Sequence, residues 1–203
     1  MSADLLQRLR SATGHLHREL DQHPVMLPLG RAQLSLEEYR AALSMMLIPQ
    51  RTLETVVEAA LPLYWPDYAY ASRYPLIIKD LERMGGYEPN VHNDFKTSRT
   101  IINSAQLLGT LYLLEGSRLG AQVIQRQLQQ QGIESGFFAS AATDAGMSWQ
   151  RFRSRLALIP HEQYEVAVES ATNGFLLYLD SAERVYRSIN PGCSGRLSPE
   201  KAS

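Results

Sequence analysis

An apolar segment interrupted by two glycines runs from Leu111 to Ile124 and reads LYLLEGSRLGAQVI. Gly116 and Gly120 stand about one helical turn apart in it, with Ala121 beside the second glycine. An interior glycine costs a helix about 1 kcal/mol of stability relative to alanine. Three small residues within two turns therefore indicate that something approaches the backbone of this helix closely. A flat ligand and a neighbouring helix are the two candidates.

The overall composition fits one domain with a sizeable core. The chain has 203 residues, of which 44% are hydrophobic, and no shift in composition marks a second domain. With 20 basic and 21 acidic residues the formal net charge is −1. A broad nucleic-acid-binding surface is therefore not indicated, although a local basic cluster can still bind a small anion.

Membrane and export signals are weak in this sequence. The most apolar run, residues 101–114, is shorter than the roughly 20 residues that a membrane span needs. The first residues, MSADLLQRLRSATGHL, are too rich in charge for the core of a signal peptide. Cys193 is the only cysteine, which excludes an internal disulfide and fits a reducing compartment. We therefore expect a soluble cytoplasmic protein that binds neither nucleic acid nor membranes.

Helical periodicity runs through nearly the whole chain, and convincing strand alternation is absent. Ser35 followed by Glu38 has the pattern of a capping box at a helix start, and Gly132 is a stop signal for the glycine-interrupted helix. The sequence predicts helices over residues 2–23, 36–61, 77–84, 98–131, 147–158 and 160–189. The expected fold is all-α, a single multi-helix bundle domain over residues 1–189, followed by a flexible tail over residues 190–203.

Few residues in the chain carry the chemistry of a metal site or a hydrolase. The five histidines are His15, His17, His23, His92 and His161. His15 and His17 stand about 200° apart on a helix, so they cannot share a metal ion there. The repeated Glu-x-x-His pair of a di-iron bundle is absent, as are HExxH, CxxC, GxSxG and a P-loop. These absences remove most hydrolase and nucleotide-binding functions.

Four motifs, taken together and in order, resemble those of the haem oxygenase family. The string LRSATGHLHREL is similar to the family's proximal helix, in which a Leu-basic-x-Ala-Thr stretch precedes the histidine that ligates the haem iron. LEGSRLGAQVI resembles the distal helix, with its Gly-x-x-x-Gly spacing. RFRSRL and ATNGFLLYL resemble the family's basic helix and its C-terminal helix. The matches span nearly the whole chain, and the Glu-Gly-Ser form of the distal motif looks most like the bacterial branch.

The resemblance implies an axial ligand and a distal wall for haem b. His17 takes the position of the iron-ligating histidine, while Glu19 and Asp21 remain alternatives for the acceptor that holds its other nitrogen. The distal wall is formed by Gly116, Ser117, Gly120 and Ala121, of which the first three act in catalysis beside bound dioxygen. Ser117 stands where animal members carry an aspartate that organises water, so the proton relay cannot be copied to this chain.

The resemblance also implies contacts at the rim of the haem. Arg153 matches the family arginine that pairs with a haem propionate, and Arg10 stands where a basic residue precedes the proximal histidine. Phe175 is expected to border the haem pocket. Trp149 replaces a family lysine, which leaves fewer fixed cations at the rim.

The activity implied by the resemblance is oxidative cleavage of haem by O2 to biliverdin, ferrous iron and carbon monoxide. No flavin or nicotinamide site is recognisable, so the electrons would come from an external ferredoxin or reductase. The bacterial branch includes members that supply biliverdin to phytochromes, which makes a bacteriophytochrome a candidate acceptor. The alternative is a haem carrier or sensor without turnover, and a related helical fold with another small-molecule reaction is more remote. The glycine pair favours the enzyme, because a carrier has no need to bring its backbone against bound oxygen.

Overall fold

The computed structural model describes residues 2–86 and 100–191, and these ranges contain helices and no strand. The α-helices of this part of the chain are α1 (Ser2–Gln22), α2 (Leu36–Tyr64), α3 (Tyr74–Arg83), α4 (Ser104–Gln130), α5 (Gly136–Thr143), α6 (Ala145–Arg155) and α7 (Tyr164–Ile189). Short 3₁₀ helices lie between them, namely η1 (Leu27–Gly30), η3 (Leu156–Leu158) and η4 (His161–Gln163). The all-α fold class predicted from periodicity is confirmed.

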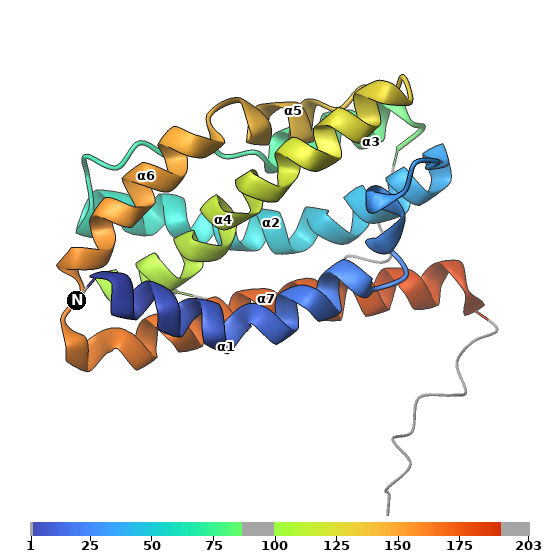
Figure 1. Ribbon diagram of the computed structural model, residues 1–203. Coiled ribbons are helices and arrows are strands. Elements are labelled where there is room, and N and C mark those ends of the chain that lie inside the picture. The colour runs from blue at the N-terminus through green and yellow to red at the C-terminus, as the bar shows by residue number, and fades with distance from the viewer. Residues whose placement is uncertain (1, 87–99, 192–203) are drawn as a thin grey trace, which may run out of the picture.

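The helices pack around α4. Helices α1 and α7 lie side by side along one edge of the molecule, and α4 crosses above them (Figure 1). Helix α4 packs against α7, α5 and α6, while α2 packs against α7, α3 and α4. Leucines at helical spacing fill the space between, and Leu5, Leu9, Leu107 and Leu111 are fully buried. Each such side chain contributes about 1.5–3 kcal/mol. This packing brings segments from both ends of the chain next to α4.

Two helix boundaries show the local signals on which the predictions relied. The Glu38 N–H donates to Ser35 Oγ at 3.1 Å and the Ser35 N–H donates to the Glu38 carboxylate at 2.9 Å, so the predicted capping box of α2 is confirmed. After α3, Gly85 and Gly86 have φ angles of 94° and 90°, which only glycine adopts readily. Helix α2 therefore begins at residue 36, as the sequence predicted, and α3 ends within one residue of its predicted end.

The largest differences from the prediction are in α4 and α5. Helix α4 begins at Ser104, so the predicted start near residue 98 is wrong: Asn103 caps the helix by accepting a hydrogen bond from the Gln106 N–H at 2.9 Å. Helix α5 has no counterpart among the predicted helices. It is too short for a periodic pattern, and its only local signal is Ser135, which caps it by accepting from the Phe138 N–H at 3.0 Å. The segment EPNVHNDF, residues 88–95, which the sequence predicts to be a loop, and the predicted tail from residue 192 lie outside the described residues.

Helices α4 and α7 approach each other closely at Gly109. A Cβ atom on Gly109 would lie 2.8 Å from Ser170 Cβ and still nearer the carbonyl oxygen of Ala167. This is a spacing that real Cβ atoms essentially never show, so Gly109 sets the distance between the two helices.

In the described ranges no helix is long and apolar enough to cross a bilayer.

Candidate functional site

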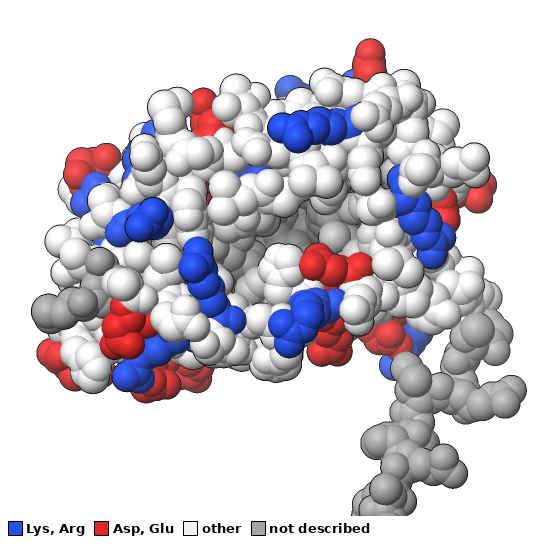
Figure 2. Space-filling model, viewed as in Figure 1, with Lys and Arg blue, Asp and Glu red and all other residues white. Residues whose placement is uncertain are grey.

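A cavity of about 310 Å³ opens between α1 and α4. The space-filling view shows this face hollowed, with basic side chains around the opening (Figure 2). Helices α2, α5, α6 and α7 close the remaining sides. The lining is mostly apolar and includes Leu20, Met26, Met46, Leu113, Ile124, Phe137, Phe138 and Phe175. An apolar cavity with a few polar groups is the usual form of a small-molecule site.

His17 lies on the α1 side of the cavity and pairs with Asp21, one helical turn later. The distance between His17 Nδ1 and Asp21 Oδ2 is 2.8 Å. In the neutral tautomer Nδ1–H donates to the carboxylate, which leaves the lone pair on Nε2 for a metal. The ring of Phe175 lies 5.7 Å from the imidazole, centroid to centroid. From the sequence, either Glu19 or Asp21 could accept the hydrogen bond from the second nitrogen of His17. The structure places Asp21 there, four residues after His17 on the same face of the helix.

On the α4 side, the wall is formed by Gly116, Ser117, Gly120 and Ala121. A Cβ atom on Gly116 would lie 3.8 Å from the ring of Trp149, an ordinary contact, and one on Gly120 would meet nothing within 4 Å. No described backbone is therefore packed against either glycine. Of the two candidates raised by the sequence, a closely packed helix backbone is therefore absent at these glycines: Gly116 faces the Trp149 ring and Gly120 faces open space. Both glycines line the cavity.

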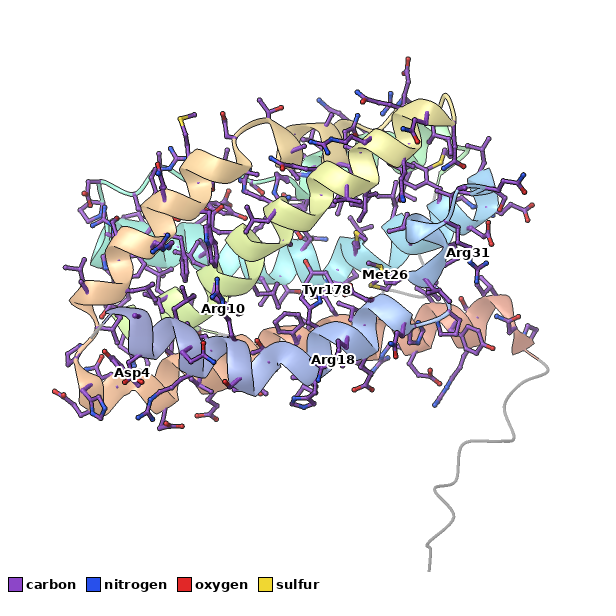
Figure 3. All side chains as sticks on the ribbon, in the orientation of Figure 1. Asp4, Arg10, Arg18, Met26, Arg31 and Tyr178 are labelled. Carbon is purple, nitrogen blue, oxygen red and sulfur yellow. The ribbon has the colours of Figure 1, made fainter. Side chains whose placement is uncertain are left out.

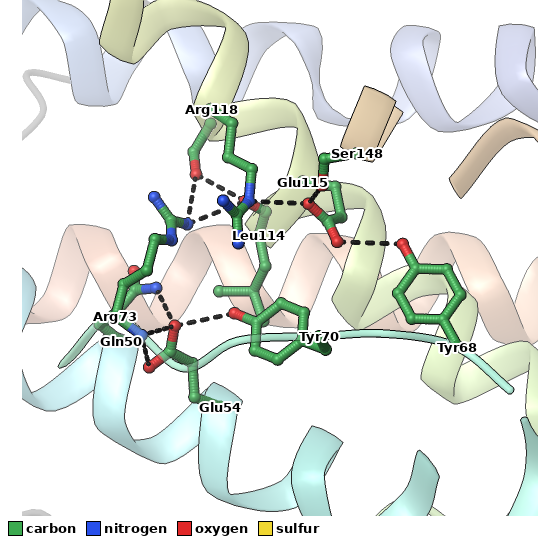
Figure 4. Close-up of polar contacts among 10 residues, drawn as sticks. Gln50, Glu54, Tyr68, Tyr70, Arg73, Leu114, Glu115, Arg118 and Ser148 are labelled. Carbon is green, nitrogen blue, oxygen red and sulfur yellow. Dashed lines mark hydrogen bonds and ion pairs between the residues drawn. The ribbon is translucent and has the colours of Figure 1, made fainter. Parts of the chain in front are cut away.

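A buried arginine contributes a polar part of the cavity wall. Arg73 is only 1% exposed, and its Nη2 donates to the Leu114 carbonyl at 3.1 Å and to Ser117 Oγ at 3.4 Å (Figure 4). Ser117 Oγ itself donates to the Leu114 carbonyl at 2.8 Å. Arg73 Nε is buried and has no hydrogen-bond partner among the described residues. Because Arg73 lines the cavity and carries only donors, it is a candidate donor to a molecule that binds there.

Arg73, Gln50 and Tyr178 also line the cavity, although no sequence motif predicted them as site residues. Arginine is almost always exposed, and Arg73 precedes α3 outside any periodic segment, so no local pattern marks it as buried. Gln50 and Tyr178 lie in periodic helices, but 128 positions separate them in the sequence. Only the tertiary fold brings the three side chains together.

The buried carboxylate of Glu115 anchors α4 next to the glycines. Glu115 is 1% exposed, and its Oε2 lies 2.8 Å from Arg118 Nε. The same carboxylate accepts hydrogen bonds from Tyr68 Oη at 3.0 Å and from Ser148 Oγ of α6. Burial, reinforced by the charge of Glu115, raises the pKa of Tyr68 well above its ordinary value, so Tyr68 remains a donor. These contacts fix α4 against α6 beside Gly116.

Of the two arginines predicted at the rim of the haem, one lines the cavity and the other does not. Arg10 is exposed, lines the cavity, and points from α1 towards the opening between α1 and α4 (Figure 3). Arg153 is exposed on α6 and does not belong to the described residues that line the cavity. Trp149 of α6 lines it instead and stacks on Phe152 with ring centroids 4.9 Å apart. The propionate contacts assigned to Arg10 and Arg153 remain predictions.

The donor set of the cavity fits a haem better than a bare metal ion. Within residues 2–86 and 100–191, no three His, Cys, Asp or Glu side chains gather where they could hold a metal ion. A single imidazole, that of His17, suffices when a macrocycle supplies the other ligands. A flat macrocycle also fits an apolar slot whose wall carries glycines, and its acidic edge fits the guanidinium of Arg10.

Comparisons with known proteins cover almost the whole chain. It is 22% identical over 214 residues to heme oxygenase 1 of Gallus gallus, which covers 94% of this chain and 72% of that protein. The solved NO- and CO-bound heme oxygenase of Neisseria meningitidis is 24% identical with a TM-score of 0.70, over 98% of both chains. Heme oxygenase from Leptospira interrogans is 17% identical with a TM-score of 0.66, over 90% of this chain and 98% of that one.

A further similar structure is heme oxygenase-1 of the cyanobacterium Synechocystis in complex with heme. It is 14% identical with a TM-score of 0.63, over 92% of this chain and 96% of that one. The family model described as Heme oxygenase matches residues 3–184, a range that holds both sides of the cavity, from His17 on α1 to Phe175 on α7. The chain belongs to the haem oxygenase family.

Proposed function

We propose that this protein cleaves haem b with O2 to biliverdin, ferrous iron and carbon monoxide. The observation that carries the proposal is the cavity, with His17 on one side and, on the other, Gly116 and Gly120, against which no described backbone packs. Bound haem supplies the iron at which O2 is reduced, and its porphyrin ring is the substrate that is cleaved. The chain itself supplies binding, orientation and protons.

Binding of the iron is assigned to His17 Nε2. Asp21 accepts from Nδ1–H at 2.8 Å, which selects the tautomer with the lone pair on Nε2 and increases the basicity of the ring. Phe175 and Ala121, both buried and lining the cavity, supply apolar contacts to the macrocycle.

Orientation of the haem is assigned to the cations at the opening. Arg10 can donate two parallel hydrogen bonds to a propionate carboxylate. Arg153 is proposed as a second propionate contact that reaches the rim from the exposed side of α6. With Trp149 at the lining position on α6, the carboxylate edge is held mainly from α1.

Proton delivery is assigned to the α4 side of the cavity. The hydrogen of Ser117 Oγ is directed at the Leu114 carbonyl, so Ser117 presents an acceptor, which receives a hydrogen bond from Arg73. Gly116 and Gly120 leave the backbone of α4 open to the bound molecule. In this arrangement, water held by Arg73 takes the role that an aspartate side chain has in other members.

The electrons are proposed to come from an external donor, a ferredoxin or a reductase, because the sequence holds no recognisable flavin or nicotinamide site. A cytoplasmic location belongs to the same proposal. So does delivery of biliverdin to a bacteriophytochrome, which rests on the Glu115-Gly116-Ser117 form of the distal motif.

Aerobic reduction of the haem complex tests the proposed function. Mixing the protein with haemin is expected to give a Soret complex, and supplying electrons under air is expected to bleach it while a bilin appears in the visible spectrum. A haem complex that survives the electron supply without bilin would instead indicate a carrier or sensor. Failure to form any Soret complex would remove haem chemistry from this chain.

Replacing Asp21 by alanine is expected to weaken haem binding about tenfold, because loss of the partner that orients a metal-ligating histidine typically costs 10–100-fold in affinity. Titration with haemin, followed in the Soret region, measures the change. Glu19→Ala is the matched control, since it removes the same charge from an exposed position on the same helix that does not line the cavity. Equal affinities for the two variants would show that Asp21 acts only as a surface charge.

A further inference from the structure

Glu54 of α2 is fully buried and does not line the cavity, yet hydrogen-bond donors surround it. Three of the donors are Gln50 Nε2 (2.7 Å), Tyr70 Oη (2.8 Å) and the backbone N–H of Arg73 (2.9 Å) (Figure 4). Ser72 Oγ (2.5 Å) and the backbone N–H of Tyr74 (2.8 Å) also donate to this carboxylate. Burial, reinforced by the charge of Glu54, raises the pKa of Tyr70 well above its ordinary value, so Tyr70 stays a donor. A carboxylate can only accept, so all of these groups must turn their hydrogens towards it.

This requirement fixes the orientation of the neighbouring amide. Gln50 must present its NH₂ group to Glu54, and its carbonyl oxygen Oε1 then faces Tyr178. Tyr178 Oη donates to that oxygen at 2.5 Å. Burial raises the pKa of Tyr178 far above its ordinary value, so the hydroxyl keeps its proton. With its hydrogen directed at Gln50, Tyr178 presents oxygen lone pairs to the cavity that it lines.

The same carboxylate also holds Arg73. The Arg73 N–H donates to both oxygens of Glu54, which fixes the backbone from which the guanidinium extends to Leu114 and Ser117 on α4. Arg73 has donors only, and its Nε–H is buried without a partner among the described residues. Two cavity-lining groups of opposite hydrogen-bonding type therefore depend on one carboxylate outside the cavity.

We propose that Glu54 is a positioning residue that gives the cavity wall a fixed hydrogen-bond polarity, with Arg73 as the donor and Tyr178 as the acceptor. Water molecules between a fixed donor and a fixed acceptor have a defined orientation, and this orientation sets which hydrogens and which lone pairs face a molecule bound in the cavity. The inference rests on the proposed function, because this polarity matters to a reaction only if O2 is reduced in the cavity. It adds to the reaction a residue that touches neither haem nor solvent.

The variant Glu54→Gln is expected to reverse the polarity at Tyr178 while leaving the backbone contacts in place. The new side-chain oxygen can still accept from the N–H groups of Arg73 and Tyr74, but its NH₂ group faces Gln50. The Gln50 amide then turns over and donates to Tyr178, whose own hydrogen is released into the cavity. Tyr178 changes from an acceptor into a donor.

Infrared spectroscopy of the carbon monoxide complex of the ferrous haem protein measures this polarity. A donor that faces bound carbon monoxide lowers the C–O stretching frequency, whereas a lone pair raises it. We expect Glu54→Gln to shift the band to lower frequency, and we expect this shift to vanish in a Tyr178→Phe background, where no hydroxyl can turn. Gln50→Met, which removes the acceptor of the Tyr178 hydrogen, should produce a shift of the same sign and keeps the test decisive if Glu54→Gln does not fold.

The outcomes separate this inference from the proposed function. An unmodified protein that forms no Soret complex overturns both. A Soret complex whose C–O band is unchanged by Glu54→Gln and by Gln50→Met overturns the role of Glu54 alone. A shift of equal size with and without the Tyr178 hydroxyl also overturns it, because a general loosening of the wall, and not the reversal of one hydroxyl, would then be the cause.

Discussion

Replacing His17 by alanine is expected to abolish axial ligation of haem and to weaken haem binding by more than the roughly 10–100-fold that loss of an outer partner costs. The physical reason is that, among the described residues that line the cavity, His17 is the only one with an imidazole. The Soret band of the haemin complex measures ligation directly. Added imidazole should restore the band, because the truncated side chain leaves room on the α1 side of the cavity.

The matched control for this prediction is His15→Ala. His15 is exposed on the same helix, two residues away, and does not line the cavity. Its removal should leave both the Soret band and the affinity unchanged. If His17→Ala retained the spectrum of the unmodified protein, the axial ligand would have to be another group, and the assignment of α1 as the proximal helix would be lost.

Prediction of the fold from the sequence depended on signals that lie close together along the chain. The capping box of Ser35 and Glu38 predicted the start of α2, because both halves of that signal lie within one turn. Helix α5 carried only the cap Ser135, and eight residues give too few turns for periodicity to be recognised. The predicted start of α4 was too early because apolar residues also precede Asn103, in a segment that is not helical.

The residues of the candidate site likewise fall into those that a local motif predicts and those that depend on distant parts of the chain. His17 and the pair Gly116 and Gly120 were predicted because each belongs to a local motif. Arg73 was not, because its burial depends on hydrogen bonds to Glu54, 19 positions earlier, and to Leu114, 41 positions later. A buried cation is explained only by the partners that compensate its lost hydration, and such partners are set by the fold.

Replacing Gly109 by alanine is expected to destabilise the haem-free protein by about 3 kcal/mol, because the added methyl group would overlap the backbone of Ala167 and the side chain of Ser170 on α7. Backbone cannot move aside as the end of a flexible side chain can, so α4 and α7 must separate. For a chain of this size the melting temperature should fall by roughly 6–12 °C. Differential scanning calorimetry of the haem-free protein measures both quantities.

Gly120→Ala on the same helix is the matched comparison and should act in the opposite direction. A Cβ atom on Gly120 meets nothing within 4 Å, so the gain in helix propensity, about 0.5–1 kcal/mol, is not offset by a clash. The same methyl group projects where α4 borders the cavity, so haem binding should weaken although the protein becomes more stable. If Gly120→Ala destabilised the haem-free protein as much as Gly109→Ala, the glycine would serve helix packing, and the close approach of a ligand to α4 would lose its main support.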